Sequence, residues 1–121
     1  MAGKLTTHVL DTANGCPAAR LTISLWAIAG AENANRTLLK TVQTNADGRT
    51  DEPLLTDGEF TIGVYELVFE VGQYFQQQDD SLPQPAFLDQ IPIRFGIADS
   101  ESHYHVPLLA SPWSYSTYRG S

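Results

Sequence analysis

The chain is poor in features that would each point to a particular class of protein. Cys16 is its only cysteine, so no disulfide can form within the chain. Seven Lys and Arg residues stand against 14 Asp and Glu residues, which gives a net charge of −7, and the basic residues do not cluster. A nucleic-acid-binding surface needs clustered Lys and Arg to meet the phosphates. The composition therefore argues against nucleic acid as a partner.

Long apolar runs are also missing. No stretch reaches the length of a transmembrane helix, and the opening MAGKLTTHVLD lacks the apolar segment of a secretory signal. The C-terminal residues match no lipidation or peroxisomal signal. We expect a cytoplasmic protein with no membrane partner. Cys16, beside Pro17 in the turn-like stretch NGCPA, is expected to be a small filler residue, and a catalytic thiol is the alternative.

What the chain does have is the composition of a single globular domain over residues 1–121. Hydrophobic residues make up 42 % of it and charged residues only 17 %. A small monomer has much surface to cover with charge, so the low charged fraction indicates that part of the surface is buried in an oligomer.

Period-2 alternation of apolar and polar residues predicts strands with one buried face in residues 20–30, 59–72 and 89–99. The expected core faces are Leu21, Ile23, Leu25 and Ala27; Tyr65, Leu67 and Phe69; and Ile91, Ile93, Phe95 and Ile97. Pro92 lies on the opposite face and indicates an edge strand or a bulge.

Turn dipeptides separate these strands, with Asn-Gly at 14–15 and Asp-Gly at 47–48 and 57–58. The spacing predicts an all-β sandwich of seven or eight short strands. One short helix is expected around residues 71–78.

The C-terminal stretch HYHVPLLASPWSYSTYRGS, residues 103–121, is unusual for a chain end. Such ends are commonly loose and polar, yet this one carries the rings of Trp113, Tyr115 and Tyr118, with Arg119 close to the terminal carboxylate. We therefore expect the tail to be packed, which would hold Arg119 in a defined place.

Histidines are the main candidates for chemistry. Alternation puts His103 and His105 on one face of a strand, with Val106 and Leu108 directed into the core. His8 lies near the start of the chain, far from them in sequence. Only folding or assembly could bring these groups together.

Less specific interpretations stay open. A histidine at a strand edge can simply be solvated, and Arg49, which closes the turn ADGR, can be an ordinary surface charge. The H-x-H spacing can ligate zinc, but two ligands are too few, and a third would have to come from His8 or a carboxylate.

Three motifs together resemble the 5-hydroxyisourate hydrolases, the transthyretin-related enzymes of urate catabolism. They are the opening TTHVLDTANGCPA, the turn ADGR and the ending HYHVPLLASPWSYSTYRGS, and they span essentially the whole chain. The resemblance implies a transthyretin-like β-sandwich of two four-stranded sheets with one short helix. It also implies a homotetramer whose active sites lie where subunits meet in a central channel.

The resemblance assigns residues one at a time. His8, Arg49 and His105 match the catalytic residues of the family, and His103 is more variable and is interpreted as non-catalytic. The residues implied for substrate binding are His8, Arg49, Tyr118, Arg119 and Ser121. No metal and no organic cofactor are implied.

The implied reaction is hydrolysis of 5-hydroxyisourate to 2-oxo-4-hydroxy-4-carboxy-5-ureidoimidazoline, in purine metabolism. A histidine, His8 or His105, would activate water, and Arg49 would stabilise the oxyanion. Three alternatives remain: a small-ligand carrier without catalysis, like transthyretin; a zinc hydrolase using His8, His103 and His105; and a structural sandwich with no chemistry.

Overall fold

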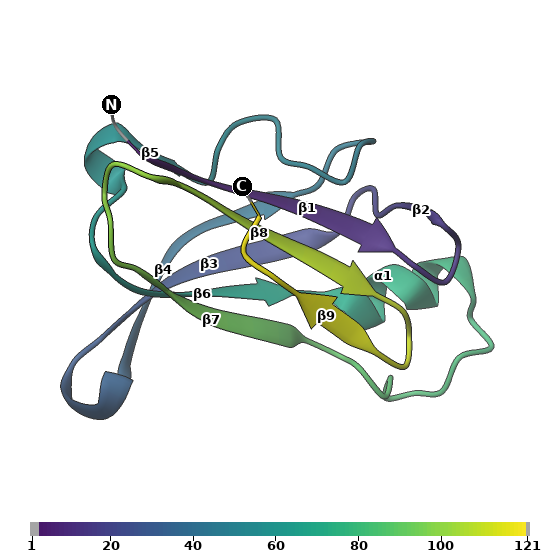
Figure 1. The fold of residues 1–121 in the computed structure, drawn as a ribbon. Helices are drawn as coiled ribbons and strands as arrows, with labels where there is room; N and C mark the ends of the chain where they lie inside the picture. Colours follow the sequence, from purple (N-terminus) through teal and green to yellow (C-terminus); the bar gives the residue numbers. More distant parts are fainter. Residues whose placement is uncertain (1–2, 121) are drawn as a thin grey trace.

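The computed structural model describes residues 3–120, which form a sandwich of two β-sheets with one α-helix (Figure 1). In chain order the elements are β1 (Lys4–Asp11), β2 (Cys16–Pro17), β3 (Thr22–Ala29), β4 (Asn35–Gln43), β5 (Leu55–Thr56), β6 (Gly63–Phe69), α1 (Val71–Gln78), β7 (Ile91–Ile97), β8 (His103–Ala110) and β9 (Tyr115–Thr117). Single 3₁₀ turns cover Ala31–Asn33 and Asp57–Glu59.

The all-β sandwich and the short helix predicted from the sequence are confirmed. One sheet has the strand order β4-β3-β6-β7. The other has the order β2-β1-β8-β9, and the two-residue strand β5 also pairs with β1, so this sheet has five strands where four were expected. Figure 1 shows β1 and β8 side by side in one layer, with β3, β6 and β7 in the layer behind them.

The core lies between the sheets and uses the faces that the alternation predicted. The exposed fraction is at most 5 % for the predicted inward residues of β6, Tyr65, Leu67 and Phe69. The inward residues of β3 and β7 also pack into the core or against it. Pro92 lies on β7 at the edge of its sheet, where a residue without an N–H does not interrupt a central ladder.

The outer face of the same sheet carries an ion pair. Glu66, opposite Arg94 across the β6–β7 ladder, accepts a hydrogen bond from the Arg94 side chain at 3.0 Å. The alternation that buries Tyr65 and Leu67 therefore directs Glu66 to this outer face.

The pairing of β1 with β8 positions the candidate functional residues. The two strands run parallel over eight residue pairs, from Lys4 opposite His103 to Asp11 opposite Ala110. Thr6 is opposite His105 in this register. Val106 and Leu108 are buried on the core side, as predicted, so the two histidines of β8 and Thr6 lie on the other face.

The C-terminal tail folds back on β8. Strand β9 pairs with it antiparallel, from Leu108 opposite Thr117 to Ala110 opposite Tyr115. The backbone is therefore held, but Trp113, Tyr115 and Tyr118 are 56 %, 45 % and 60 % exposed within the single chain. The packing expected of these rings stays a prediction for an assembly of several chains.

Among residues 3–120, no helix is both long enough and apolar enough to cross a membrane.

Candidate active site

A hollow of about 450 Å³ lies over the β1–β8 pair. Lys4, Thr6 and Thr7 of β1 line it on one side, and His103 and His105 of β8 on the other. Residues 49–53 supply the rest of the wall. The hollow therefore brings Arg49 and His105 together, two of the three residues assigned as catalytic from the sequence, although they are far apart along the chain.

Two neighbours hold the ring of His105. Its Nδ1 is 2.8 Å from the Oγ1 of Thr6, a residue 99 positions away in sequence. On the opposite edge, the backbone N–H of Gly120 donates to the carbonyl of His105 at 2.8 Å. A β-carbon built on Gly120 would lie 2.5 Å from Cδ2 of the ring, so Gly120 covers that edge at close range.

The electrostatic surroundings of His105 favour its neutral form. Burial lowers the pKa of His105 from 6.5, and the nearby positive charges of Arg49, His103 and His8 lower it further. The pKa of His103 is lowered in the same direction, by burial first and then by Lys4. Both imidazoles are therefore neutral near pH 7, and a neutral imidazole can accept a proton.

Arg49 is placed by a tight turn that is docked on β1. The N–H of Asn45 donates to the carbonyl of Arg49 at 2.7 Å, and the N–H of Arg49 donates to the side-chain oxygen of Asn45 at 3.1 Å. Gly48 has φ +75°, and a β-carbon there would come within 2.4 Å of the carbonyl oxygen of Val9. Glycine is thus required at position 48 both by the backbone conformation and by the close approach to β1.

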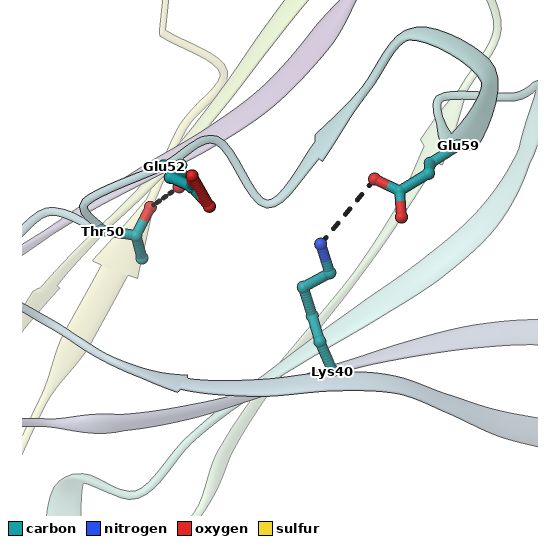
Figure 2. A network of polar contacts seen from close by, with 4 residues as sticks. All are labelled: Lys40, Thr50, Glu52 and Glu59. Atoms are coloured by element: carbon teal, nitrogen blue, oxygen red, sulfur yellow. Dashed lines mark hydrogen bonds and ion pairs between the residues drawn. The ribbon is translucent and has the colours of Figure 1, made fainter.

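The segment after Arg49 forms the outer wall of the hollow. Figure 2 shows Thr50, whose hydroxyl donates to the carbonyl of Glu52, and beside this segment the ion pair between Lys40 and Glu59. The Lys40–Glu59 distance is 3.8 Å. Lys40 is therefore paired with Glu59. The acidic residues of the wall, Asp51 and Glu52, line the hollow together with Arg49.

His8 lies on β1 beyond the hollow, and its Nε2 is 2.9 Å from the carbonyl oxygen of Asp47. A carbonyl only accepts hydrogen bonds, so Nε2 of His8 carries a proton and donates. His8 is near enough for its charge to lower the pKa of His105. Its Nε2 is thus committed to the same turn that presents Arg49.

The assigned tail residues do not enter the hollow within one chain. The guanidinium of Arg119 stacks over the ring of Tyr104, with Cζ 4.0 Å from the ring centroid. Tyr118 is exposed. Ser121 lies outside the described residues. The binding roles assigned to these three residues stay predictions.

The zinc alternative needs three ligands close together. In the described part of the chain, no group of three His, Cys, Asp or Glu side chains could hold a metal ion. His8, His103 and His105 therefore do not form a ready-made zinc site.

Sequence reasoning missed Thr6, Lys4, Asp51 and Glu52 as lining residues. Thr6 shares a strand face with His8, which alternation shows. Its contact with His105 depends on the β1–β8 register, which no local pattern encodes.

Comparison with known proteins agrees with this fold. Residues 5–120 match the model of the HIUase/Transthyretin family. The 5-hydroxyisourate hydrolase of Mesorhizobium japonicum is 61 % identical over 98 % of this chain and 93 % of its own length. The 5-hydroxyisourate hydrolase 2 of Rhizobium meliloti is 58 % identical over 99 % of this chain and 98 % of its own.

Solved structures give the same architecture. A structure of (S)-allantoin synthase matches with a TM-score of 0.91 and 49 % identity over 99 % of this chain, which spans only 44 % of that longer chain. Sea bream transthyretin in complex with thyroxine matches with a TM-score of 0.84 and 28 % identity, over 97 % of this chain and 94 % of that one.

The chain belongs to the HIUase/Transthyretin family, and its fold is the transthyretin-like sandwich. Within that family it is a hydrolase, since it shares more than half of its residues with the 5-hydroxyisourate hydrolases and 28 % with the transthyretin.

Proposed function

We propose that the chain hydrolyses 5-hydroxyisourate at its lactam C–N bond, with His105 as general base and Arg49 as the donor that stabilises the oxyanion. The observation that carries the proposal is the placement of both side chains in one hollow, where burial keeps His105 neutral. The choice of 5-hydroxyisourate as substrate rests on the relatives named 5-hydroxyisourate hydrolase.

The geometry favours His105 over His8 as the base. Nε2 of His8 carries its proton toward the carbonyl of Asp47, so that nitrogen has no lone pair for water. His105 has both edges of its ring covered, by Thr6 at Nδ1 and by Gly120 at Cδ2, so Nε2 projects from the free tip. Within residues 3–120 this Nε2 has no hydrogen-bond partner, which leaves it available for water.

The bond changes follow from these positions. Nε2 of His105 takes a proton from water as the water oxygen bonds to the lactam carbonyl carbon, and the carbonyl electron pair moves to its oxygen. Arg49, permanently charged and with a planar fork of donors, meets that oxyanion. A donor of this kind contributes about 3 kcal/mol to the transition state. The oxyanion electron pair then re-forms the C=O bond as the C–N bond breaks. The C–N electron pair goes to nitrogen, which takes the proton from the imidazolium of His105.

The protein is further proposed to act as a homotetramer with sites at subunit interfaces. The support is the exposure of the tail rings within one chain, together with the position of the hollow beside that tail. In such an assembly Tyr118, Arg119 and Ser121 would complete the binding site. Sedimentation equilibrium tests this proposal, and a monomer at micromolar concentration would contradict it. A cytoplasmic location and a place in urate catabolism stay predictions.

A carrier function is the alternative that the structural likeness to transthyretin raises. The lining of the hollow argues against it, because Lys4, Arg49 and two histidines suit a polar, reacting ligand better than an apolar cargo.

A coupled assay tests the activity directly. Urate oxidase generates 5-hydroxyisourate from urate in the cuvette, and its decay is followed by ultraviolet absorbance with and without the protein. We expect faster decay with the wild type and decay at the spontaneous rate with His105→Ala. Unchanged decay with a folded protein would remove the proposal, and equal rates for both proteins would remove the role of His105.

A further inference from the structure

Thr6 makes two hydrogen bonds with one hydroxyl group. Its Oγ1 is 2.8 Å from Nδ1 of His105 and 2.7 Å from Nε2 of His103. A hydroxyl has one proton, so it can donate in only one of these bonds and accepts in the other. The protonation of the two neutral imidazoles is therefore linked through Thr6.

Two arrangements satisfy both bonds. In the first, Nδ1–H of His105 donates to Thr6, and Thr6 donates to Nε2 of His103. In the second, every donor and acceptor is reversed, and the ring proton of neutral His105 is on Nε2. Only the first arrangement leaves Nε2 of His105 with the lone pair that a general base needs.

The surroundings select the first arrangement. Arg49 lines the same hollow and, after burial, lowers the pKa of His105. Its guanidinium offers only donors, so it favours a lone pair over an N–H on the ring nitrogen of His105 that Thr6 does not hold. At the other end, His103 must be neutral to accept from Thr6. Lys4 lies opposite His103 in the β1–β8 register, and burial first, then the charge of Lys4, lower the pKa of His103 from 6.5.

We infer that Thr6 is a positioning residue that fixes the tautomer of His105 for proton abstraction, and that His103 sets the direction in which the Thr6 hydroxyl points. Neither residue needs to touch the substrate for this. The inference deepens the function proposed above and rests on it for its effect on rate. It also gives a positioning role to His103, which was interpreted as non-catalytic from the family resemblance.

The effect persists after the proton has moved. When Nε2 of His105 takes the proton from water, Nδ1–H still points at the oxygen of Thr6, so the imidazolium keeps its hydrogen bond. In the reversed arrangement Nδ1 would be the acceptor, and the base would have to change its tautomer before each turnover.

Two matched pairs of variants test the inference. Thr6→Val removes the hydroxyl at nearly constant volume, and Thr6→Ser keeps it. His103→Leu removes the acceptor for the Thr6 proton, and His103→Gln keeps an acceptor. Thr12→Val is the control for loss of a threonine hydroxyl on this sheet, because the Thr12 side chain donates to the carbonyl of Ala110, away from the histidines.

The first readout is the tautomer of His105, from ¹⁵N–¹H long-range correlation spectra of the ring at a pH where it is neutral. We expect the proton on Nδ1 in the wild type, Thr6→Ser, His103→Gln and Thr12→Val. We expect a mixture, or the proton on Nε2, in Thr6→Val and His103→Leu. A wild-type ring protonated on Nε2, or an unchanged tautomer in Thr6→Val, would overturn the inference.

The second readout is turnover in the coupled assay. Thr6→Val and His103→Leu should lower kcat by about tenfold or more with a smaller change in KM, and the conservative member of each pair should restore it. The tautomer measurement needs no turnover. A chain that failed to hydrolyse the substrate but showed the expected tautomers would refute the proposed function and leave the role of Thr6 standing. Unchanged kcat in Thr6→Val would refute the role of Thr6 alone.

Discussion

Gly120 lies against the Cδ2 edge of the His105 imidazole, so close that a β-carbon on Gly120 would sit 2.5 Å from Cδ2 and 3.1 Å from Cγ. Its N–H also donates to the His105 carbonyl. The glycine of the YRGS ending is thus a packing requirement of the candidate base. Its backbone conformation is open to other residues, because its φ is not in the left-handed region.

Gly120→Ala should therefore damage the site without straining the backbone at residue 120. The added methyl group must displace the ring of His105 or the tail, and a displacement of about 1 Å lowers turnover by up to about a hundredfold. The coupled assay measures kcat. Gly96→Ala, where the new methyl group meets open space, is the control and should turn over normally. Equal kcat in the two variants would show that the contact does not matter for catalysis.

Arg49→Ala should lower kcat by about 10²–10³-fold, the effect of removing one oxyanion donor. Arg49→Lys should recover only part of this, because an ammonium keeps the charge but not the planar fork. Removal of the guanidinium should also raise the pKa of His105, which Arg49 lowers. The pKa can be followed by NMR titration of the ring. Normal turnover in Arg49→Ala would exclude the role proposed for this residue.

The pH profile should have its acid limb below pH 6.5. His105 must be neutral to act as a base, and burial together with the charges of Arg49, His103 and His8 holds its pKa below 6.5. As pH falls through that lowered pKa, kcat/KM should fall tenfold per pH unit. A limb with its midpoint above 6.5 would contradict the assignment.

The same shift makes a prediction for stability. Between the lowered pKa of folded His105 and 6.5, the unfolded chain binds more protons than the folded one. The free energy of unfolding should therefore rise with pH across this window. The contribution of neutral His105 to stability is lost as pH falls through the same window. Urea unfolding of the wild type and His105→Gln across this range checks the sign, since the variant should show a weaker dependence.

Tyr74→Phe should lower the free energy of unfolding by about 1–3 kcal/mol, since a buried carboxylate loses a donor. The Tyr74 hydroxyl of α1 donates to Asp11, which is 1 % exposed, at 2.8 Å. Urea unfolding measures the change. Tyr115→Phe is the control and should change little, because it keeps the ring and the Tyr115 hydroxyl donates to no group within residues 3–120. A loss as small as that of the control would mean that Asp11 does not depend on Tyr74.

Tyr74 should also limit stability in alkali. Burial, and then the hydrogen bond to Asp11, raise the pKa of Tyr74 from 10.0 to about 12. Between these values the folded chain keeps the proton on the Tyr74 hydroxyl while the unfolded chain loses it. The free energy of unfolding should therefore fall as pH rises from 10 to 12. Tyr74→Phe should show a shallower fall over that range, and an identical slope would contradict the prediction.

Much of the fold was predictable because local patterns in the sequence, above all the alternation of apolar and polar residues, determine it. The alternation over residues 59–72 and 89–99 predicted the buried faces of β6 and β7, and helix α1 begins and ends within the predicted segment 71–78. The strand β5 was not predictable in this way. Two residues are too few for a periodic pattern, and β5 exists only because β1 offers a free edge there.

The site was predictable only in part, for a related physical reason. Arg49 follows a recognisable Asp-Gly turn, and His105 follows from alternation and family resemblance. The bond from Thr6 to His105 depends on a parallel register between segments 99 residues apart. The position of Arg119 over the ring of Tyr104 could not be anticipated from the tail sequence.

The parallel pairing of β1 with β8 also orders events during synthesis. The sheet of β3, β4, β6 and β7 is built from neighbouring antiparallel strands and can close once residue 97 has been made. Strand β1 has emerged first, yet it must wait for residues 103–110 before its central partner exists. A ribosome-bound chain can thus form this sheet early, with its inner face still uncovered by the other sheet. It brings Arg49, Thr6 and His105 together only once β8 has emerged.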